Sequence, residues 1–82
     1  MKEMVTRYME MLTREHIKVF ANNQGVYISD TEVNVIYQGI KEHGRDIING
    51  EEKYIYEIED KVSPEVYQKI WELVNKYRGF LN

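Results

Sequence analysis

Two histidines, His16 and His43, are the side chains best suited to hold a metal ion or to move a proton near neutral pH. The sequence pattern places them in different helices, each near one end. Glu15 directly precedes His16, but neighbours on a helix point about 100° apart, so this pair cannot readily share a metal. The chain has no cysteine, which excludes a thiolate zinc site and a cysteine nucleophile. We therefore interpret both histidines as surface residues and expect no metal and no cofactor.

Acidic side chains offer a second kind of chemistry, because paired carboxylates perform acid–base catalysis in glycosidases. Glu57, Glu59 and Asp60 lie close together in the sequence, but a helical bundle of 82 residues rarely has a cleft deep enough to shift their pKa values. The two serines, Ser29 and Ser63, are better explained as helix caps than as nucleophiles. The sequence also lacks a phosphate-binding glycine loop. We therefore predict a protein that is not an enzyme and has no catalytic residues.

Aromatic residues are the one enriched class, with seven tyrosines, two phenylalanines and one tryptophan. Near the C-terminus they are interleaved with basic residues, a combination that binds single-stranded nucleic acid by stacking and charge. The residues concerned are Lys69, Trp71, Lys76, Tyr77 and Arg78. The same segment has the spacing of an ordinary buried helix face, and the net charge of −3 comes without a basic half or tail. Nucleic-acid binding is therefore the alternative function, behind protein binding.

The N-terminal segment gives the stronger lead to a binding surface. Met4, Tyr8 and Met11 lie at helical spacing, beside a second apolar stripe that runs from Val5 to Leu12. So wide an apolar surface on a terminal helix is either buried in the core or docks a partner or a second copy of the chain. Burial is the more ordinary outcome, but methionine-rich faces are typical of adaptable binding surfaces. If the protein binds a partner or itself, we expect this face to be used.

Helix-start signals mark the elements that would position these residues. Thr13 can cap one helix, Ser29 and Glu32 form a capping box for the next, and Ser63 precedes a proline at the first helical position. Apolar residues follow each start at helical spacing, and residues 2–12 have the same spacing. The pattern therefore predicts at least four helices.

Glycines mark the expected helix ends. Gly25, Gly44 and Gly79 each follow an apolar stripe, and we expect a helix to end at each of them. Gly39 lies inside the helix that follows Ser29, where a glycine usually permits close approach by another helix.

The apolar residues of segment 51–62 fit both the spacing of a helix and that of a strand. Asn49 and Glu52 form a potential capping box before a helical stripe, whereas the tyrosines and isoleucines of the same segment also alternate as in a strand. We favour the helix, because acidic residues at its start complement the helix dipole and the chain offers no good second strand. A short strand pair between residues 27–28 and 47–48 stays open.

Several cap and turn residues also follow the pattern of one family. They are Thr13, Glu15, Gly25, Asn49 and Ser63. Over residues 12–77 the chain resembles the YqfT-like family, an uncharacterised family of short helical proteins from Gram-positive, spore-forming bacteria. The pair Arg45-Asp46 and the tyrosine-rich YIYEIE segment depart from that pattern. The resemblance implies a small helical cytosolic protein and assigns no activity, cofactor or functional residue.

Length and composition bound the fold. A chain of 82 residues and 9.9 kDa suits one domain with one modest core, and 43% hydrophobic against 30% charged residues indicates a globular chain. No apolar run approaches the roughly 18 residues of a membrane span, and charges at Glu3, Arg7 and Glu10 argue against a signal peptide. We predict a single all-α domain over residues 1–82, a bundle of four to five short helices with tight capped turns, in the cytoplasm. Its expected function is that of a non-enzymatic protein interaction module or homo-oligomer.

Overall fold

The computed structural model describes residues 2–81, and the side chains of residues 3–77. Over this range the chain forms five α-helices and one 3₁₀ turn. They are α1 (Lys2–Met11), α2 (Arg14–Asn23), α3 (Asp30–Ile48), α4 (Lys53–Glu57), the 3₁₀ turn η1 (Glu59–Lys61) and α5 (Pro64–Leu81). Residues 2–81 contain no strand, so the all-α prediction is confirmed and the short strand pair does not form.

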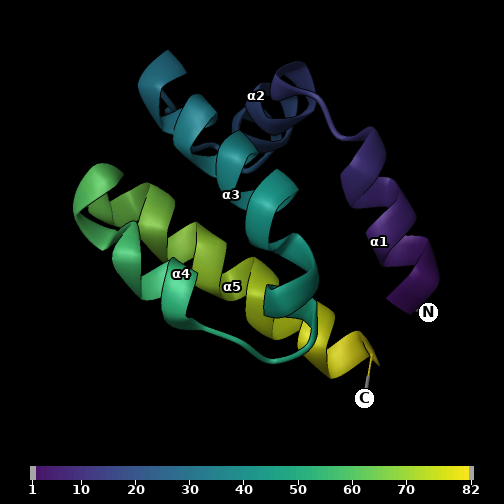
Figure 1. Ribbon diagram of the computed structural model, residues 1–82. Helices are drawn as coiled ribbons and strands as arrows, with labels where there is room; N and C mark the ends of the chain where they lie inside the picture. The colour runs from purple at the N-terminus through teal and green to yellow at the C-terminus, as the bar shows by residue number, and fades with distance from the viewer. Residues whose placement is uncertain (1, 82) are drawn as a thin grey trace.

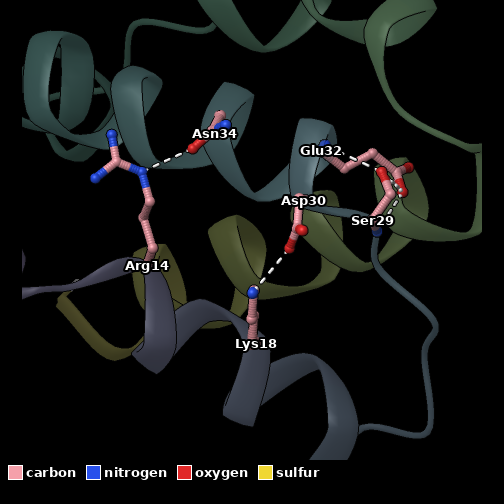
Figure 2. A network of polar contacts seen from close by, with 6 residues as sticks. All are labelled: Arg14, Lys18, Ser29, Asp30, Glu32 and Asn34. Carbon is pink, nitrogen blue, oxygen red and sulfur yellow. Dashed lines mark hydrogen bonds and ion pairs between the residues drawn. The ribbon is translucent and has the colours of Figure 1, made fainter.

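The helix caps predicted at Thr13, Ser29 and Ser63 form in the structure. Thr13 Oγ1 accepts a hydrogen bond from the His16 backbone N–H at 3.2 Å, and His16 Nδ1 accepts one from the Thr13 N–H at 3.1 Å. Ser29 Oγ accepts from the Glu32 N–H at 3.2 Å, and Glu32 Oε1 accepts from the Ser29 N–H at 3.0 Å (Figure 2). Ser63 Oγ accepts from a backbone N–H in the first turn of α5 at 3.2 Å. Each cap satisfies backbone donors that have no partner within the helix.

Two of the three predicted helix ends are wrong. Gly25 follows α2 with a φ of 72°, as expected of a glycine that ends a helix. Gly44, however, is buried inside α3, which continues to Ile48 with Asn49 as its C-cap. The left-handed glycine that follows this helix is Gly50, with a φ of 103°. Gly79 lies inside α5. A glycine ends a helix by adopting the left-handed conformation, so its presence after an apolar stripe does not suffice.

The acidic segment after α3 forms two short pieces, α4 and η1, rather than one continuous helix. The predicted capping box of Asn49 and Glu52 is also wrong. Asn49 is the C-cap of α3, and Glu52 precedes α4 without a capping hydrogen bond from its side chain. The left-handed turn at Gly50 separates the two residues. The predicted apolar stripe is nevertheless confirmed, because Ile55 and Ile58 are buried.

Helix α3 lies at the centre of the molecule. Helices α1 and α2 pack on one side of it, and α4 and α5 pack on another (Figure 1). A cluster of buried valines, Val26, Val62 and Val66, forms the core between the α2–α3 connection and the start of α5. On the outside, Arg14 and Lys18 of α2 reach polar groups at the start of α3 at 2.7 and 2.8 Å (Figure 2).

One carboxylate joins two helix starts. Glu32 Oε1 caps its own helix, and Oε2 accepts a hydrogen bond from the Ser63 N–H, just before α5, at 2.7 Å. Partial burial raises the pKa of Glu32, but the hydrogen bonds from Ser29 and Ser63 together outweigh burial and hold that pKa below its ordinary value. The charged form of Glu32 therefore stabilises the arrangement of α3 and α5.

Helix α1 is held mainly along one edge. Met9 packs against Gly44 of α3, where any larger residue would meet the Met9 sulfur. Lys41 Nζ donates to the carbonyl oxygens of Met9 and Glu10 at 3.0 and 2.6 Å, and Arg45 pairs with the Glu10 carboxylate at 2.7 Å. Among the described α1 side chains, none is fully buried. This helix therefore adds little to the core.

Gly39 confirms the prediction of a close approach. The ring of Tyr54 lies directly over it, so that a β-carbon at this position would overlap the ring. Tyr54 also stacks on His43, with the ring centroids 4.2 Å apart. Glycine at position 39 thus allows α4 to pack tightly on α3.

Candidate functional site

An apolar cleft opens between α1 and α5. Its larger hollow has a volume of about 470 Å³ and is lined by α1, α3, α4 and α5 with residue 58. A smaller hollow of about 180 Å³ is lined by α1, α2, α3 and α5, with residues of the α2–α3 connection. Both hollows share the lining residues Tyr8, Ile36, Ile40, Ile70, Leu73 and Tyr77. We call the two hollows together the α1–α5 cleft.

The cleft exists because α1 and α5 both pack on α3 but scarcely approach each other. Val5 and Tyr8 form the α1 wall, and Ile70, Leu73 and Tyr77 form the α5 wall. Within each wall these residues are three or four positions apart, the spacing of one helix face. The floor is the apolar face of α3 between the walls. Each wall therefore presents an apolar helical face that stays partly exposed in the cleft.

The lining of the cleft is almost entirely hydrocarbon and aromatic. Apart from tyrosine hydroxyls, the polar side chains among the lining residues are His16, Gln24 and Lys69, all at the smaller hollow. Burial of such an apolar surface against another molecule is favourable, because it removes apolar area from water. Its chemistry suits binding, because acid–base or nucleophilic catalysis needs polar groups converging on a reacting atom.

The predicted partner-binding residues are exposed in the structure. Met4, Tyr8 and Met11 have 72%, 62% and 70% of their surface accessible, so their burial in the core is contradicted. Met4 and Tyr8 line the cleft, whereas Met11 continues the same stripe toward α2. The sequence thus located one rim of the cleft, and we call these three residues the α1 stripe.

The structure does not bring the residues that could bind nucleic acid together on one face of α5. Trp71 packs between Tyr56 and Tyr67, with ring centroids 5.4 and 6.3 Å away. Lys69 pairs with Glu72 at 3.0 Å. At 100° per residue, Lys69 and Lys76 lie about 140° to 160° around the helix from Trp71. Tyr77 lines the cleft, and the Arg78 side chain lies outside the described residues.

The two histidines take part in different contacts, and His43 Nε2 lies 3.7 Å from the Glu42 carboxylate. His16 serves the Thr13 cap and lines the smaller hollow, whereas His43 stacks on Tyr54. The side chains of Glu57, Glu59 and Asp60 are exposed, and none of them lines the cleft. Within residues 2–81, no group of three or more histidine, aspartate or glutamate side chains is placed to hold a metal ion.

The size of the molecular surface agrees with a hollowed shape. The accessible surface is 5776 Å², whereas a folded chain of this mass exposes about 5,200 Å². The radius of gyration, 11.9 Å, is close to the roughly 12 Å of a compact domain of this length. The chain therefore exposes about 600 Å² more surface than an average compact protein of its mass.

Leu73 is the cleft residue that the sequence reasoning missed. It lies three residues after Ile70 and four before Tyr77, so it broadens the apolar face of α5 beyond what one core contact needs. The width of this apolar face is the sequence signal from which Leu73 could have been identified. Ile36 and Ile40 lie on the apolar face of the helix that follows Ser29, and they remain partly exposed on the floor of the cleft.

Comparison with protein-family models, curated proteins and solved structures gave no match for this chain. The resemblance to the YqfT-like family therefore remains a prediction. In the part of the chain that the structure describes, no helix combines the length and apolar character required to cross a membrane.

Proposed function

We propose that the protein is a small, non-enzymatic interaction module of the cytoplasm that binds another protein chain through the α1–α5 cleft. The observation that carries this proposal is the apolar cleft itself, with Met4 and Tyr8 exposed at its rim. Contiguous exposed apolar surface on a small protein is typical of a site where another molecule binds.

The shape of the cleft favours a protein partner. Its walls carry apolar residues at the spacing of helix faces, and α3 closes the floor between them. An amphipathic helix presents anchors at the same spacing, three or four residues apart, and buries them in such grooves. The methionine and tyrosine side chains at the rim are common in interfaces, because they combine large apolar area with adaptability.

The test compares complexes formed in the cells that produce the protein. A tagged chain and its Met4→Lys, Met11→Lys double variant are purified gently, and stoichiometric protein partners are identified by mass. We expect the wild type to carry a protein partner, a second copy of the chain included, and the double variant to lose it. Both methionines are exposed, so lysine at these positions leaves the fold intact.

Tyr27→Lys provides the matched control, because Tyr27 is 80% exposed but lies in the α2–α3 connection and does not line the cleft. It should keep the partner. Far-UV circular dichroism verifies that each variant is folded. A wild type without any stoichiometric protein, or equal loss in the control, would contradict the proposed function.

A further inference from the structure

Two cations from different helices gather at one tyrosine ring. The guanidinium carbon of Arg14, in α2, lies 4.3 Å from the centroid of the Tyr37 ring in α3, and the Lys41 ammonium lies 5.4 Å from the same centroid. The electron-rich face of the ring attracts both cations, although their like charges repel each other. None of the three residues lines the α1–α5 cleft. We call them the Arg14–Tyr37–Lys41 cluster.

Arg14 is held in place with one edge of its guanidinium left open. Its Nε donates a hydrogen bond to Asn34 Oδ1 at 2.7 Å, and Figure 2 shows the two terminal nitrogens pointing away from Asn34. Among the side chains of residues 3–77, no carboxylate forms an ion pair with Arg14, which is exposed. Two neighbouring terminal N–H groups of a guanidinium form a fork that matches a pair of phosphate or carboxylate oxygens. Arg14 therefore presents a fixed fork that an anion can reach.

Lys41 is held in a similar way. Its Nζ donates to the carbonyl oxygens of Met9 and Glu10 at 3.0 and 2.6 Å, which uses two of the three donors of an ammonium group. Those carbonyls carry no net charge, and the Glu10 carboxylate is paired with Arg45 instead. Lys41 therefore keeps a positive charge and a third donor beside the same ring as Arg14.

The neighbouring cations of α2 and α3 are matched with carboxylates. Lys18, one turn after Arg14 on α2, pairs with Asp30 at 2.8 Å (Figure 2), and Arg45 is paired as described above. In this part of the molecule, the described positive charges without a carboxylate partner are therefore those of the cluster. They stand out in a chain whose net charge is −3.

We propose that the Arg14–Tyr37–Lys41 cluster is a binding site for a phosphate monoester. Such a group carries about −1.5 to −2 charges near neutral pH and three acceptor oxygens, which suits two positive charges with open donors. The Arg14 fork binds two of the oxygens, and Lys41 supplies the second positive charge. A carboxylate, with one charge, would use less of the site. The site lies apart from the α1–α5 cleft, so this inference goes beyond the proposed function and can fail without it.

A nuclear magnetic resonance titration of the purified full chain tests this site. The probes are inorganic phosphate and a short phosphoserine peptide, at constant ionic strength and a pH of about 7.5, where both carry close to two negative charges. We expect saturable shifts of the Arg14 Nε signal and of the amides of residues 37 and 41. The dissociation constant should lie between about 0.1 and 5 mM, because exposed ion pairs each contribute little.

The two probes distinguish the sources of the phosphate group. Binding of both shows that the phosphate group alone suffices, whereas binding of the peptide alone assigns the site to a phosphorylated chain. Either result supports the proposal. The same peptide without its phosphate should not bind.

Variants of α2 separate the fork from the overall charge. Arg14→Gln should raise the dissociation constant at least about tenfold, and Arg14→Lys, which keeps the charge but loses the fork, about threefold or more. Lys18→Gln is the matched control, because it removes one positive charge from the same helix, but a charge that Asp30 already pairs. It should change the constant by less than about twofold. Circular dichroism verifies each fold, and Arg14→Lys decides if Arg14→Gln does not fold.

Three results would overturn the inference. The first is the absence of saturable shifts with either probe up to about 20 mM. The second is equal weakening by Lys18→Gln and by the Arg14 variants. The third is tighter binding of a single-stranded oligonucleotide than of either probe through the same residues, which would assign the cluster to a nucleic-acid backbone.

Discussion

Replacing Glu32 with alanine removes a carboxylate that caps two helices at once. Its oxygens accept hydrogen bonds from the Ser29 N–H and Oγ, both at 3.0 Å, and from the Ser63 N–H at 2.7 Å. Loss of one helix cap costs about 0.5 to 2 kcal/mol, so losing part of two caps should lower the free energy of unfolding by about 2 kcal/mol. In a domain of this size that corresponds to a fall in Tm of roughly 8 to 16 °C.

The pH dependence of this loss separates the charge from the packing of the side chain. Because the folded-state pKa of Glu32 lies below the ordinary value of 4.5, the folded protein binds this proton less tightly than the unfolded chain does. The stabilisation is therefore fully present above pH 4.5 and is lost as the pH falls through the folded-state pKa. Glutamine does not titrate, so the difference between wild type and Glu32→Gln should shrink over that window.

Urea unfolding followed by circular dichroism, at neutral pH and near pH 3, measures both effects. Glu65→Gln is the control, because Glu65 is an exposed residue in the first turn of α5. Its carboxylate interacts favourably with the dipole of α5 but does not cap the helix. It should change the free energy of unfolding by less than about 1 kcal/mol. The reasoning is refuted if Glu32→Ala costs no more than this control, or if the Glu32→Gln difference is the same at both pH values.

Two further predictions concern close contacts of α3. Gly39→Ala should destabilise the fold by about 1 to 2 kcal/mol, because overlap of the new methyl group with the Tyr54 ring outweighs the better helix propensity of alanine. Gly44→Ala should cost less, because its methyl group clashes with the flexible end of the Met9 side chain, which can move. Thermal unfolding of the pair checks this order, and equal costs would contradict it. Lys41→Met removes the ammonium that caps the last carbonyls of α1, and it should speed amide exchange in α1 about fivefold with little change in Tm. Unchanged exchange in α1 would show that Lys41 does not hold the helix.

The helix starts were predictable because capping is local. Thr13, Ser29 and Ser63 each bind a backbone group three residues away, so the signal and its effect lie in the same few residues. The same holds for the left-handed turn at Gly25, which closes α2. These features depend on backbone geometry that the adjacent sequence fixes.

The long-range features were not predictable in this way. Glu32 reaches Ser63, 31 residues away, and the pattern of the capping box shows only one of its two roles. Gly44 has the sequence surroundings of a helix end, yet it lies mid-helix with Met9 packed against it. Such contacts depend on how α1 and α5 are set against α3, which periodicity does not specify.

The candidate site was found from one side only. The apolar stripe of α1 predicted a binding surface at Met4 and Tyr8, and both residues line the cleft. On the opposite wall, Tyr77 has the spacing of an ordinary buried helix face and Leu73 was missed, because helical spacing indicates an apolar face but not whether a neighbour covers it. Only the separation of α1 from α5 shows that this face stays open.

The most direct test of the central claim, that the α1–α5 cleft holds another protein chain, is photo-cross-linking at its α5 wall. Photo-reactive benzoylphenylalanine replaces Tyr77, or Tyr27 as the control, and the cells that produce the protein are irradiated. Tyr77 lines both hollows and is 46% exposed, whereas Tyr27 is 80% exposed and lines neither. The account predicts a discrete protein adduct from position 77 that is several-fold stronger than from position 27. No adduct from position 77, or equal adducts from both positions, would contradict it.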